Sequence, residues 1–213
     1  MRMMSLNEEK WLGGSMDLRI KKTYQALTGS FTALLSERPY EDISVAALCD
    51  RATIRRTTFY KHFKDKDDFF AFFVRSLRLG MTAGGESGID ELDVRSETAL
   101  VGRVQVIGEL ASFLVDHQAV MDNVIKSSAS GTLFEVIGEN LAKAVRCRYP
   151  VLGDVPEKAE RLDVAAEFAA GGITRLMREW WARGDVRQSR EDFVRSADEL
   201  VGFVMDGATA AME

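Results

Sequence analysis

The scarcity of proline and the spacing of the apolar residues constrain the fold more than any other feature of this 213-residue chain. Only three prolines occur, and the stretches between them are rich in Ala, Leu, Glu, Arg and Phe, a composition that favours helix. Apolar residues recur at intervals of three and four, as they do on one face of a helix. No alternating strand pattern of convincing length is present. The sequence therefore predicts an all-α protein.

Four helices are predicted before residue 80. The first begins at Asp17 and ends near Arg38, because the residue before a proline disfavours helical geometry. A short second helix begins after Ser44, whose hydroxyl suits the N-cap position. A turn then leads into a third helix at about 55–61, and a fourth helix begins near Asp67.

Five further helices are predicted downstream, at about 97–117, 118–127, 131–147, 157–183 and 190–211. This order predicts an N-terminal domain over residues 17–80 and a second helical domain over residues 81–213. Residues 1–16 have no sustained period, and we expect a flexible tail there. Either Met1 or Met16 could be the start of translation.

A short segment that is both basic and aromatic stands out in a chain whose formal net charge is -5. From Arg51 to Lys66, six residues are Lys or Arg and one is acidic. Residues 1–80 carry 14 basic and 10 acidic side chains, whereas residues 81–213 carry 14 and 23. A basic first third on an acidic body indicates a polyanionic partner, although charge asymmetry without function is the alternative.

The helices around this segment have the order of a helix-turn-helix, in which the second short helix enters the major groove of DNA. Arginine can fork onto guanine, and threonine can bond a base or touch a thymine methyl. The predicted base readers are Arg55, Arg56, Thr57 and Thr58.

Hydroxyl, ammonium and imidazole groups at the helix end can bond phosphate oxygens. The predicted phosphate ligands are Tyr60, Lys61 and His62. Ile54, Phe59 and Phe63 have the spacing of an inward stripe. A solvated basic face is the alternative for the arginines.

These residues resemble the N-terminal DNA-binding domain of the TetR (tetracycline-repressor) family of bacterial transcriptional regulators. The resemblance extends over residues 17–80, about a third of the chain. It rests on the segments Tyr24-Gln25-Ala26-Leu27, Tyr40-Glu41-Asp42-Ile43-Ser44-Val45, Thr58-Phe59-Tyr60-Lys61-His62-Phe63 and Lys66-Asp67. It implies a three-helix helix-turn-helix domain followed by a C-terminal helical bundle for effector binding and dimerisation.

Two positions depart from the family pattern. Thr53 stands in the turn, where the family usually has Gly, so this residue must adopt the turn without the conformational freedom of glycine. Arg55 stands where a small polar residue often caps the recognition helix. These departures leave the fold prediction intact and make the operator sequence harder to predict.

The resemblance also implies a function and partners. We expect a ligand-responsive, sequence-specific repressor that acts as a homodimer in the cytoplasm on a roughly palindromic operator of double-stranded DNA. Ser44 is implied to contact phosphate at the start of the second helix, and Lys66 to reach the DNA backbone. A small molecule bound in the second domain would shift the separation of the two DNA-binding domains of the dimer.

Small residues in the penultimate helix indicate close approach by another helix. Gly171 and Gly172 each cost roughly 1 kcal/mol in a helix relative to Ala, and in several family members the last two long helices form the dimer interface. The predicted interface residues are Ala169, Gly172, Phe193, Leu200 and Val204. Packing within one subunit is the alternative.

A set of large apolar side chains in the second domain could line an effector cavity. The predicted pocket residues are Phe113, Met121, Phe134, Met177 and Trp180. A filled core is the alternative for each of them.

Other classes of protein find little support in the sequence. No nucleophile elbow, phosphate loop, paired-His metal motif or dinucleotide fingerprint occurs, so an enzyme is not expected. Cys49 and Cys147 match no metal spacing, and neither a metal nor a cofactor is expected. No run approaches the ~18 apolar residues needed to span a membrane. A helical protein-interaction adaptor that has lost DNA binding is the main alternative function.

Overall fold

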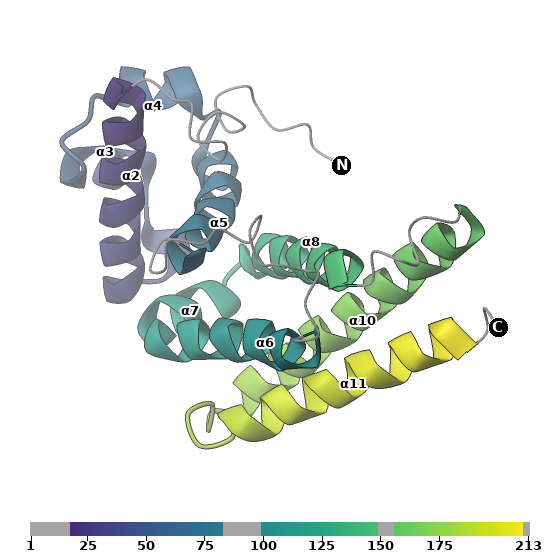
Figure 1. Cartoon of the computed structure of the whole chain (residues 1–213). Coiled ribbons are helices and arrows are strands. Elements are labelled where there is room, and N and C mark those ends of the chain that lie inside the picture. The colour runs from purple at the N-terminus through teal and green to yellow at the C-terminus, as the bar shows by residue number, and fades with distance from the viewer. Residues whose placement is uncertain (1–17, 83–98, 149–155, 211–213) are drawn as a thin grey trace. The chain divides into compact units, whose positions relative to one another are not determined.

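The computed structural model describes residues 18–82, 99–148 and 156–210, and every regular element in these ranges is helical (Figure 1). The all-α prediction is therefore confirmed. Two compact units divide the described ranges: the first holds 18–82 and 117–133, and the second holds 99–116, 134–148 and 156–210. The tail predicted at 1–16 lies outside the described residues, and the predicted domain limits stay predictions.

The first unit contains the four helices predicted before residue 80, with bounds close to those predicted, and one helix from further along the chain. Its elements are α2 (Leu18–Glu37), the 3-10 helix η1 (Tyr40–Asp42), α3 (Val45–Arg51), α4 (Arg56–His62), α5 (Lys66–Thr82) and α7 (Gln118–Ile125).

A cluster of aromatic rings forms the core of this unit. Phe31 of α2 is fully buried, and its ring meets those of Phe69 and Phe73 on α5 at centroid distances of 5.2 and 5.0 Å, in edge-to-face geometry. Phe59 and Phe63 are buried in the same cluster, since Phe63 lies 5.5 Å from Phe59 and 5.0 Å from Phe69. Such pairs contribute about 0.5–1.5 kcal/mol each beyond the area they bury, so the core fixes α4 against α2 and α5.

Two polar contacts tie residues 117–133 to the start of the first unit. The amide of Asn123 donates to the carbonyl oxygen of Leu35, in the last turn of α2, at 2.7 Å. The backbone N–H of Ser128 donates to Oε1 of Glu41 at 2.7 Å, and this bond lowers the pKa of the Glu41 carboxyl. The first contact gives a partner to one of the carbonyls that a helix end leaves unpaired.

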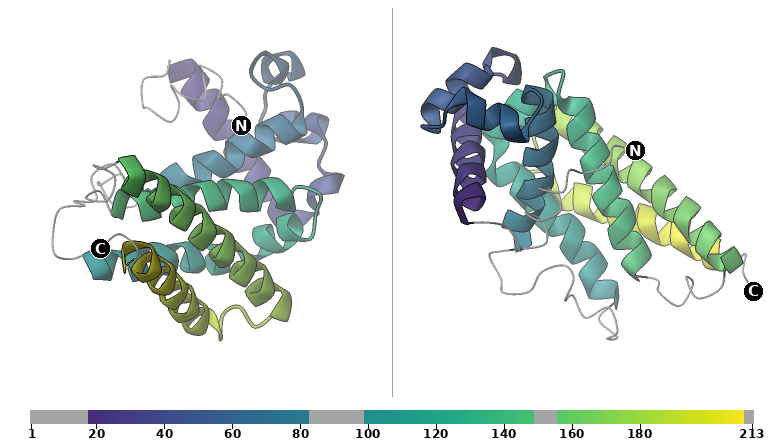
Figure 2. Two further views of the ribbon diagram at one scale, coloured as in Figure 1. Left: turned by 90° about the vertical axis from the view of Figure 1, so that its right-hand side faces the viewer. Right: turned by 90° about the horizontal axis from the view of Figure 1, so that it is seen from above.

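The second unit is built from four helices: α6 (Ala99–Asp116), most of α8 (Ser130–Arg148), α10 (Pro156–Arg183) and α11 (Arg190–Ala210). The two long helices, α10 and α11, lie side by side in all three views (Figures 1 and 2). α11 also packs on α6, where Arg190 donates to the hydroxyl of Ser112 at 3.1 Å.

Close contacts join α10 to α11 within the chain. A Cβ at Gly172 would lie 2.5 Å from Cδ2 of Leu200, so the α11 leucine occupies the space that a larger side chain would need. Further along, the rings of Trp180 and Phe193 stack at 4.5 Å with an interplanar angle of 7°. Trp180 Nε1 also donates to the hydroxyl of Ser189 at 2.9 Å. The small and aromatic residues of α10 therefore fit the last helix of their own subunit.

Candidate nucleic-acid interface

Ser44 begins the helix-turn-helix as its N-cap. Its backbone is extended, and its Oγ accepts a hydrogen bond from the N–H of Ala47 at 3.1 Å. The predicted cap is thus confirmed, and it gives a partner to one of the unpaired N–H groups of the first turn of α3. Ser44 is exposed.

The turn between α3 and α4 is a Schellman motif with threonine in the position that glycine usually fills. The N–H of Ile54 donates to the carbonyl of Cys49 at 2.9 Å, and the N–H of Thr53 donates to that of Asp50 at 3.2 Å. This pair of bonds defines the motif. Thr53 has a φ of 55°, a left-handed conformation in which the Cβ of an L-residue is crowded. The strain expected from the sequence is therefore present.

Arg55 is the N-cap of α4, and its side chain makes no capping hydrogen bond. Its backbone carbonyl accepts from the N–H of Thr58 at 2.8 Å, which starts the helix. Because the guanidinium carries donors only, it cannot accept a bond from the first N–H groups of α4 as a serine would. The cap position thus presents a cation to solvent in place of a capping oxygen.

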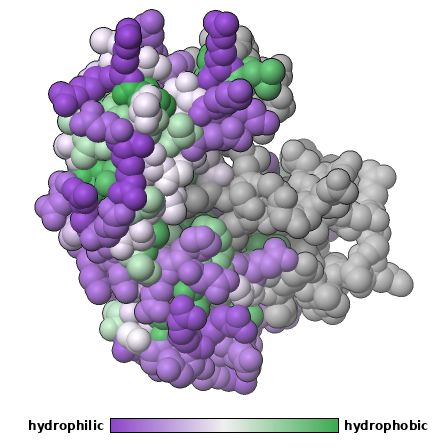
Figure 3. Space-filling model, turned by 90° about the vertical axis from the view of Figure 1, so that its left-hand side faces the viewer, coloured by the Kyte–Doolittle hydropathy of each residue, from purple (hydrophilic) through white to green (hydrophobic). Residues whose placement is uncertain are grey.

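α4 has an outward polar face and an inward aromatic face. Phe59 and Phe63 are buried, and Ile54 is partly buried, which confirms the predicted inward stripe. Of the predicted DNA-binding residues between 55 and 62, the exposed ones are Arg55, Arg56, Thr57, Tyr60 and Lys61. Thr58 and His62 are partly buried. Figure 3 shows the side of the molecule where α3 and α2 lie, and hydrophilic side chains (purple) cover most of its described surface.

His62 lies at the end of α4 against the first half of α2. Its Nδ1 is 3.4 Å from the hydroxyl of Tyr24, and the two rings meet edge to face at 5.3 Å. Burial, followed by the charge of Lys61, lowers the pKa of the His62 imidazole below its ordinary value of 6.5. The contact therefore joins the end of the recognition helix to α2.

Lys66 is held inside its own unit. Its Nζ donates to the carbonyl of Tyr40 at 2.8 Å and lies 4.0 Å from the centroid of that ring. Burial lowers the pKa of the Lys66 ammonium, with partial compensation by Asp67 and Glu41. The Tyr40 hydroxyl in turn donates to Asp67, and burial together with this carboxylate raises the pKa of Tyr40. A phosphate contact by Lys66 stays a prediction.

Arg51 forms an ion pair with Glu37 that the sequence pattern did not indicate. Its NH1 and NH2 atoms lie 2.7 Å from Oε2 and Oε1 of Glu37, respectively. This two-pronged pair links the end of α3 to the end of α2, and it lowers the pKa of the Glu37 carboxyl. Arg51 contributes to the basic run in sequence, but in the structure its charge is balanced by an acid 14 residues earlier.

The five residues predicted to form an effector pocket are not all in one unit. Met121 belongs to the first unit, whereas Phe113, Phe134, Met177 and Trp180 belong to the second. Met177 and Trp180 are buried, and the Phe134 ring lies under the guanidinium of Arg178 at 4.1 Å. Their role in effector binding stays a prediction.

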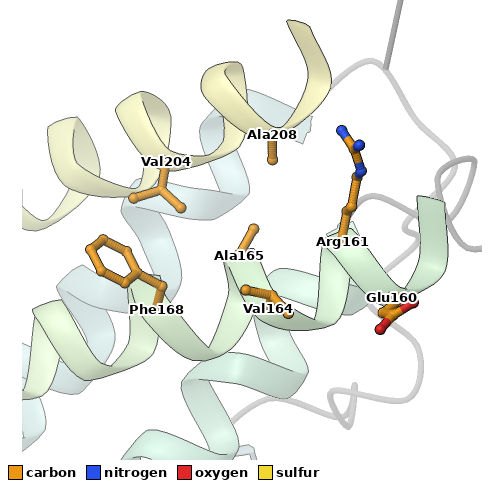
Figure 4. Close-up of a pocket in the computed structure, with 7 residues that line it drawn as sticks. All are labelled: Glu160, Arg161, Val164, Ala165, Phe168, Val204 and Ala208. Carbon is orange, nitrogen blue, oxygen red and sulfur yellow. The ribbon is translucent and has the colours of Figure 1, made fainter. Parts of the chain in front are cut away.

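The residues predicted to form a dimer interface differ in whether their own subunit covers them. Ala169 and Phe193 are buried, and Gly172 faces Leu200 of the same chain. Only Val204 lines an open groove between α10 and α11, together with Glu160, Arg161, Val164, Ala165, Phe168 and Ala208. In Figure 4, Ala165 points toward α11, Val204 and Ala208 point back toward α10, and Glu160 turns away.

In residues 18–82, 99–148 and 156–210, no group of three or more His, Cys, Asp or Glu side chains could hold a metal ion. None of the helices within them is long and apolar enough to cross a membrane.

The strained turn gives a stability prediction. We expect Thr53→Gly to raise the free energy of unfolding by about 0.5–1 kcal/mol, because relief of a left-handed L-residue, worth about 1–2 kcal/mol, exceeds the entropic cost of glycine. Chemical denaturation measures the change. Thr53→Ala is the matched control, since it retains the Cβ and should gain little. An equal gain from alanine would show that backbone strain is not the cause.

The partly buried imidazole of His62 gives a pH prediction. The chain has two histidines. In the His117→Gln variant the single remaining imidazole signal belongs to His62, and NMR titration of that signal gives its pKa. Its pKa should lie below 6.5 in the free protein. Because the unfolded state then binds more protons below pH 6.5, the free energy of unfolding falls as pH drops from there through the folded-state pKa, and then levels off. A pKa at or above 6.5 would contradict the Tyr24 packing.

Comparisons with known proteins agree with this geometry. Residues 32–71 match the N-terminal model described as bacterial regulatory proteins, tetR family, and this range spans the helix-turn-helix. No curated protein matches the chain.

Two solved structures are similar to the chain over most of its length. The dihydroxyacetone kinase operon activator DhaS shares 14% identity, with 88% of this chain and 97% of that chain covered and a TM-score of 0.56. RolR, crystallised without ligand, shares 14% identity, with 84% and 96% covered and a TM-score of 0.52. At that identity the likeness shows the fold alone. The match assigns the helix-turn-helix segment, residues 32–71, to the tetR family of bacterial regulatory proteins.

Proposed function

We propose that this protein is a sequence-specific, ligand-responsive repressor that acts as a homodimer on a roughly palindromic operator in the cytoplasm. One observation carries the DNA-binding part of the proposal. The outward face of α4 exposes Arg55, Arg56 and Thr57, while the inward face is anchored by Phe59 and Phe63. A rigid helix with forked donors near its N-terminus suits the major groove.

The remaining polar residues are the proposed phosphate ligands. Tyr60 and Lys61 are exposed on the second half of α4, where hydroxyl and ammonium groups can bond phosphate oxygens. The Nδ1 atom of His62 faces Tyr24, so Nε2 is the ring nitrogen that would meet a phosphate. Ser44 and Lys66 complete the proposed phosphate set, although both side chains also bond within their own unit.

The exposed apolar side chains of α10 and α11 support a dimer. Val164 and Phe168 on α10 are 66% and 67% exposed, and Phe203 on α11 is 82% exposed. Large apolar patches on a protein surface mark interaction sites, and α10 and α11 bring this one together around the groove. We propose that the same two helices of a second copy cover it, so that Val164, Phe168, Phe203 and Val204 form the interface. Ala169, Gly172 and Phe193 would support it from within each subunit.

The ligand response would be a population shift between two states of the dimer. An effector changes DNA affinity only if it binds those states differently. A 10-fold to 100-fold change requires about 1.4–2.8 kcal/mol of coupling. The core around Phe113, Phe134, Met177 and Trp180 is the proposed site, because its apolar side chains would suit an apolar effector after repacking.

An adaptor that has lost DNA binding is the alternative function. The exposed arginines at Arg55 and Arg56 disfavour it, because an adaptor has no need of cations at the start of α4. We propose a regulatory role and no catalytic activity, because the helix-turn-helix matches the tetR family of regulatory proteins.

Selection of genomic fragments with the purified protein tests the proposed function. We expect enrichment of a roughly palindromic site whose half-sites lie about 34–36 Å apart, one turn of DNA, because this spacing mirrors a two-fold axis. Absence of any enriched site at moderate salt would contradict sequence-specific binding.

Substitutions in α4 then separate base reading from phosphate binding. Arg56→Ala should weaken binding to the selected site by about 1–3 kcal/mol and relax its base preference. Lys61→Ala should weaken binding to all duplexes alike and reduce the salt slope by about 1. Arg38→Ala, which removes an exposed cation at the far end of α2, serves as the control. Equal effects of Arg56→Ala on selected and random duplexes would exclude a base contact.

The proposed dimer predicts a mass of about twice 23.7 kDa by light scattering. Phe203→Glu should yield monomers, because it places a charge in the interface while leaving the subunit core intact. Leu18→Glu is the control, since Leu18 is similarly exposed but lies in the first unit. A monomeric parent at micromolar concentration, or a dimeric Phe203→Glu variant, would contradict this interface.

A further inference from the structure

We propose that Lys21, at the end of the first turn of α2, binds a DNA phosphate beside the one reached from the end of α4, and so widens the DNA contact beyond the helix-turn-helix. The inference rests on the proposed DNA-binding function. It adds a residue outside the segment that the family model matches, which begins at residue 32.

The packing of Tyr24 places this part of α2 at the end of the recognition helix. The Tyr24 ring lies 5.3 Å from that of His62 and 5.2 Å from that of Phe63, and its hydroxyl is 3.4 Å from His62 Nδ1. Tyr24 is fully buried by these contacts. In Figure 1 the first turns of α2 (dark purple) lie next to α4. The face of α2 that carries Tyr24 therefore borders the end of α4.

Helical geometry puts Lys21 on that face and Lys22 off it. Residues three apart on a helix are neighbours on its surface, so Lys21 lies on the same side as Tyr24, about 4.5 Å closer to the start of the helix. Lys22 is two residues from Tyr24, which places it roughly 200° away around the helix axis. Both lysines are exposed. The chain thus offers two cations of identical chemistry in adjacent positions, of which one borders α4.

The charge at this end of α4 makes the position of Lys21 significant. The lowered pKa of His62 keeps its imidazole neutral near pH 7, where it can still donate a hydrogen bond. Lys61, at the end of α4, places a permanent positive charge beside His62, and the proposed second charge is that of Lys21, across the Tyr24 contact. Two ammonium groups flanking one neutral donor suit successive phosphates of a single strand, because phosphate contacts depend on charge and require no base readout.

Salt-dependent binding of the full-length protein tests the assignment. The probe is a mixed-sequence duplex of about 30 base pairs, roughly three helical turns, and the variants are Lys21→Gln and Lys22→Gln. Lys21→Gln should reduce the slope of log K against log salt by about 0.9 for each Lys21 in contact with a phosphate. Its affinity should fall about threefold to tenfold at moderate salt, whereas Lys22→Gln should match the parent protein. Lys21→Arg should restore the slope.

The outcomes separate this inference from the proposed function. If the parent protein binds DNA but the two glutamine variants share one slope, the assignment of Lys21 is wrong and the proposed function stands. If the parent protein binds no duplex at low salt, the DNA-binding function fails and the Lys21 contact fails with it. Unchanged thermal unfolding of both variants, expected for exposed side chains, shows that the slopes report on contacts and not on folding.

Discussion

The aromatic cluster that surrounds Phe59 and Phe63 is the interaction on which the candidate interface depends. α4 has seven residues, far fewer than the ~12–15 at which an isolated helix becomes even marginally stable in water. It has no side-chain N-cap either. Its stability must therefore come from the rings of α2 and α5 that enclose its inward face. The same contacts fix the direction of the outward face, so the packed core also determines where the arginines are presented.

The turn before α4 contains a strained residue, which the packing around it holds in place. Thr53 takes a left-handed conformation that glycine would adopt without strain, yet both bonds of the Schellman motif form around it. The motif determines the angle at which α4 leaves α3. Strain persists at such sites only where the surrounding structure over-determines the conformation. Here the buried side chains on both sides of the turn, Cys49 and Phe59, supply that constraint.

Local patterns in the sequence predicted the parts of the structure that local physics determines. Helix positions followed from apolar periodicity, and the cap at Ser44 and the strain at Thr53 followed from single residues. Local patterns could not predict contacts between residues that are distant in the sequence. Arg51 pairs with Glu37, 14 positions away, and Lys66 packs against Tyr40, 26 positions away. For the same reason the glycines at 171 and 172 indicated close approach by another helix, but they could not show that Leu200 of the same chain lies against Gly172.

The path of the chain limits how a ligand response could reach the DNA-binding residues. Residues 117–133 pack in the first unit, although the chain on either side of them belongs to the second. Within the first unit they hold the last turn of α2 through Asn123 and the η1 segment through the Glu41–Ser128 bond. The second unit is thus joined covalently to both ends of a segment that grips α2, the helix whose Tyr24 supports the end of α4. In the proposed ligand response, a rearrangement of α6 or α8 would reach α2 through these covalent links and the contacts of Asn123 and Ser128.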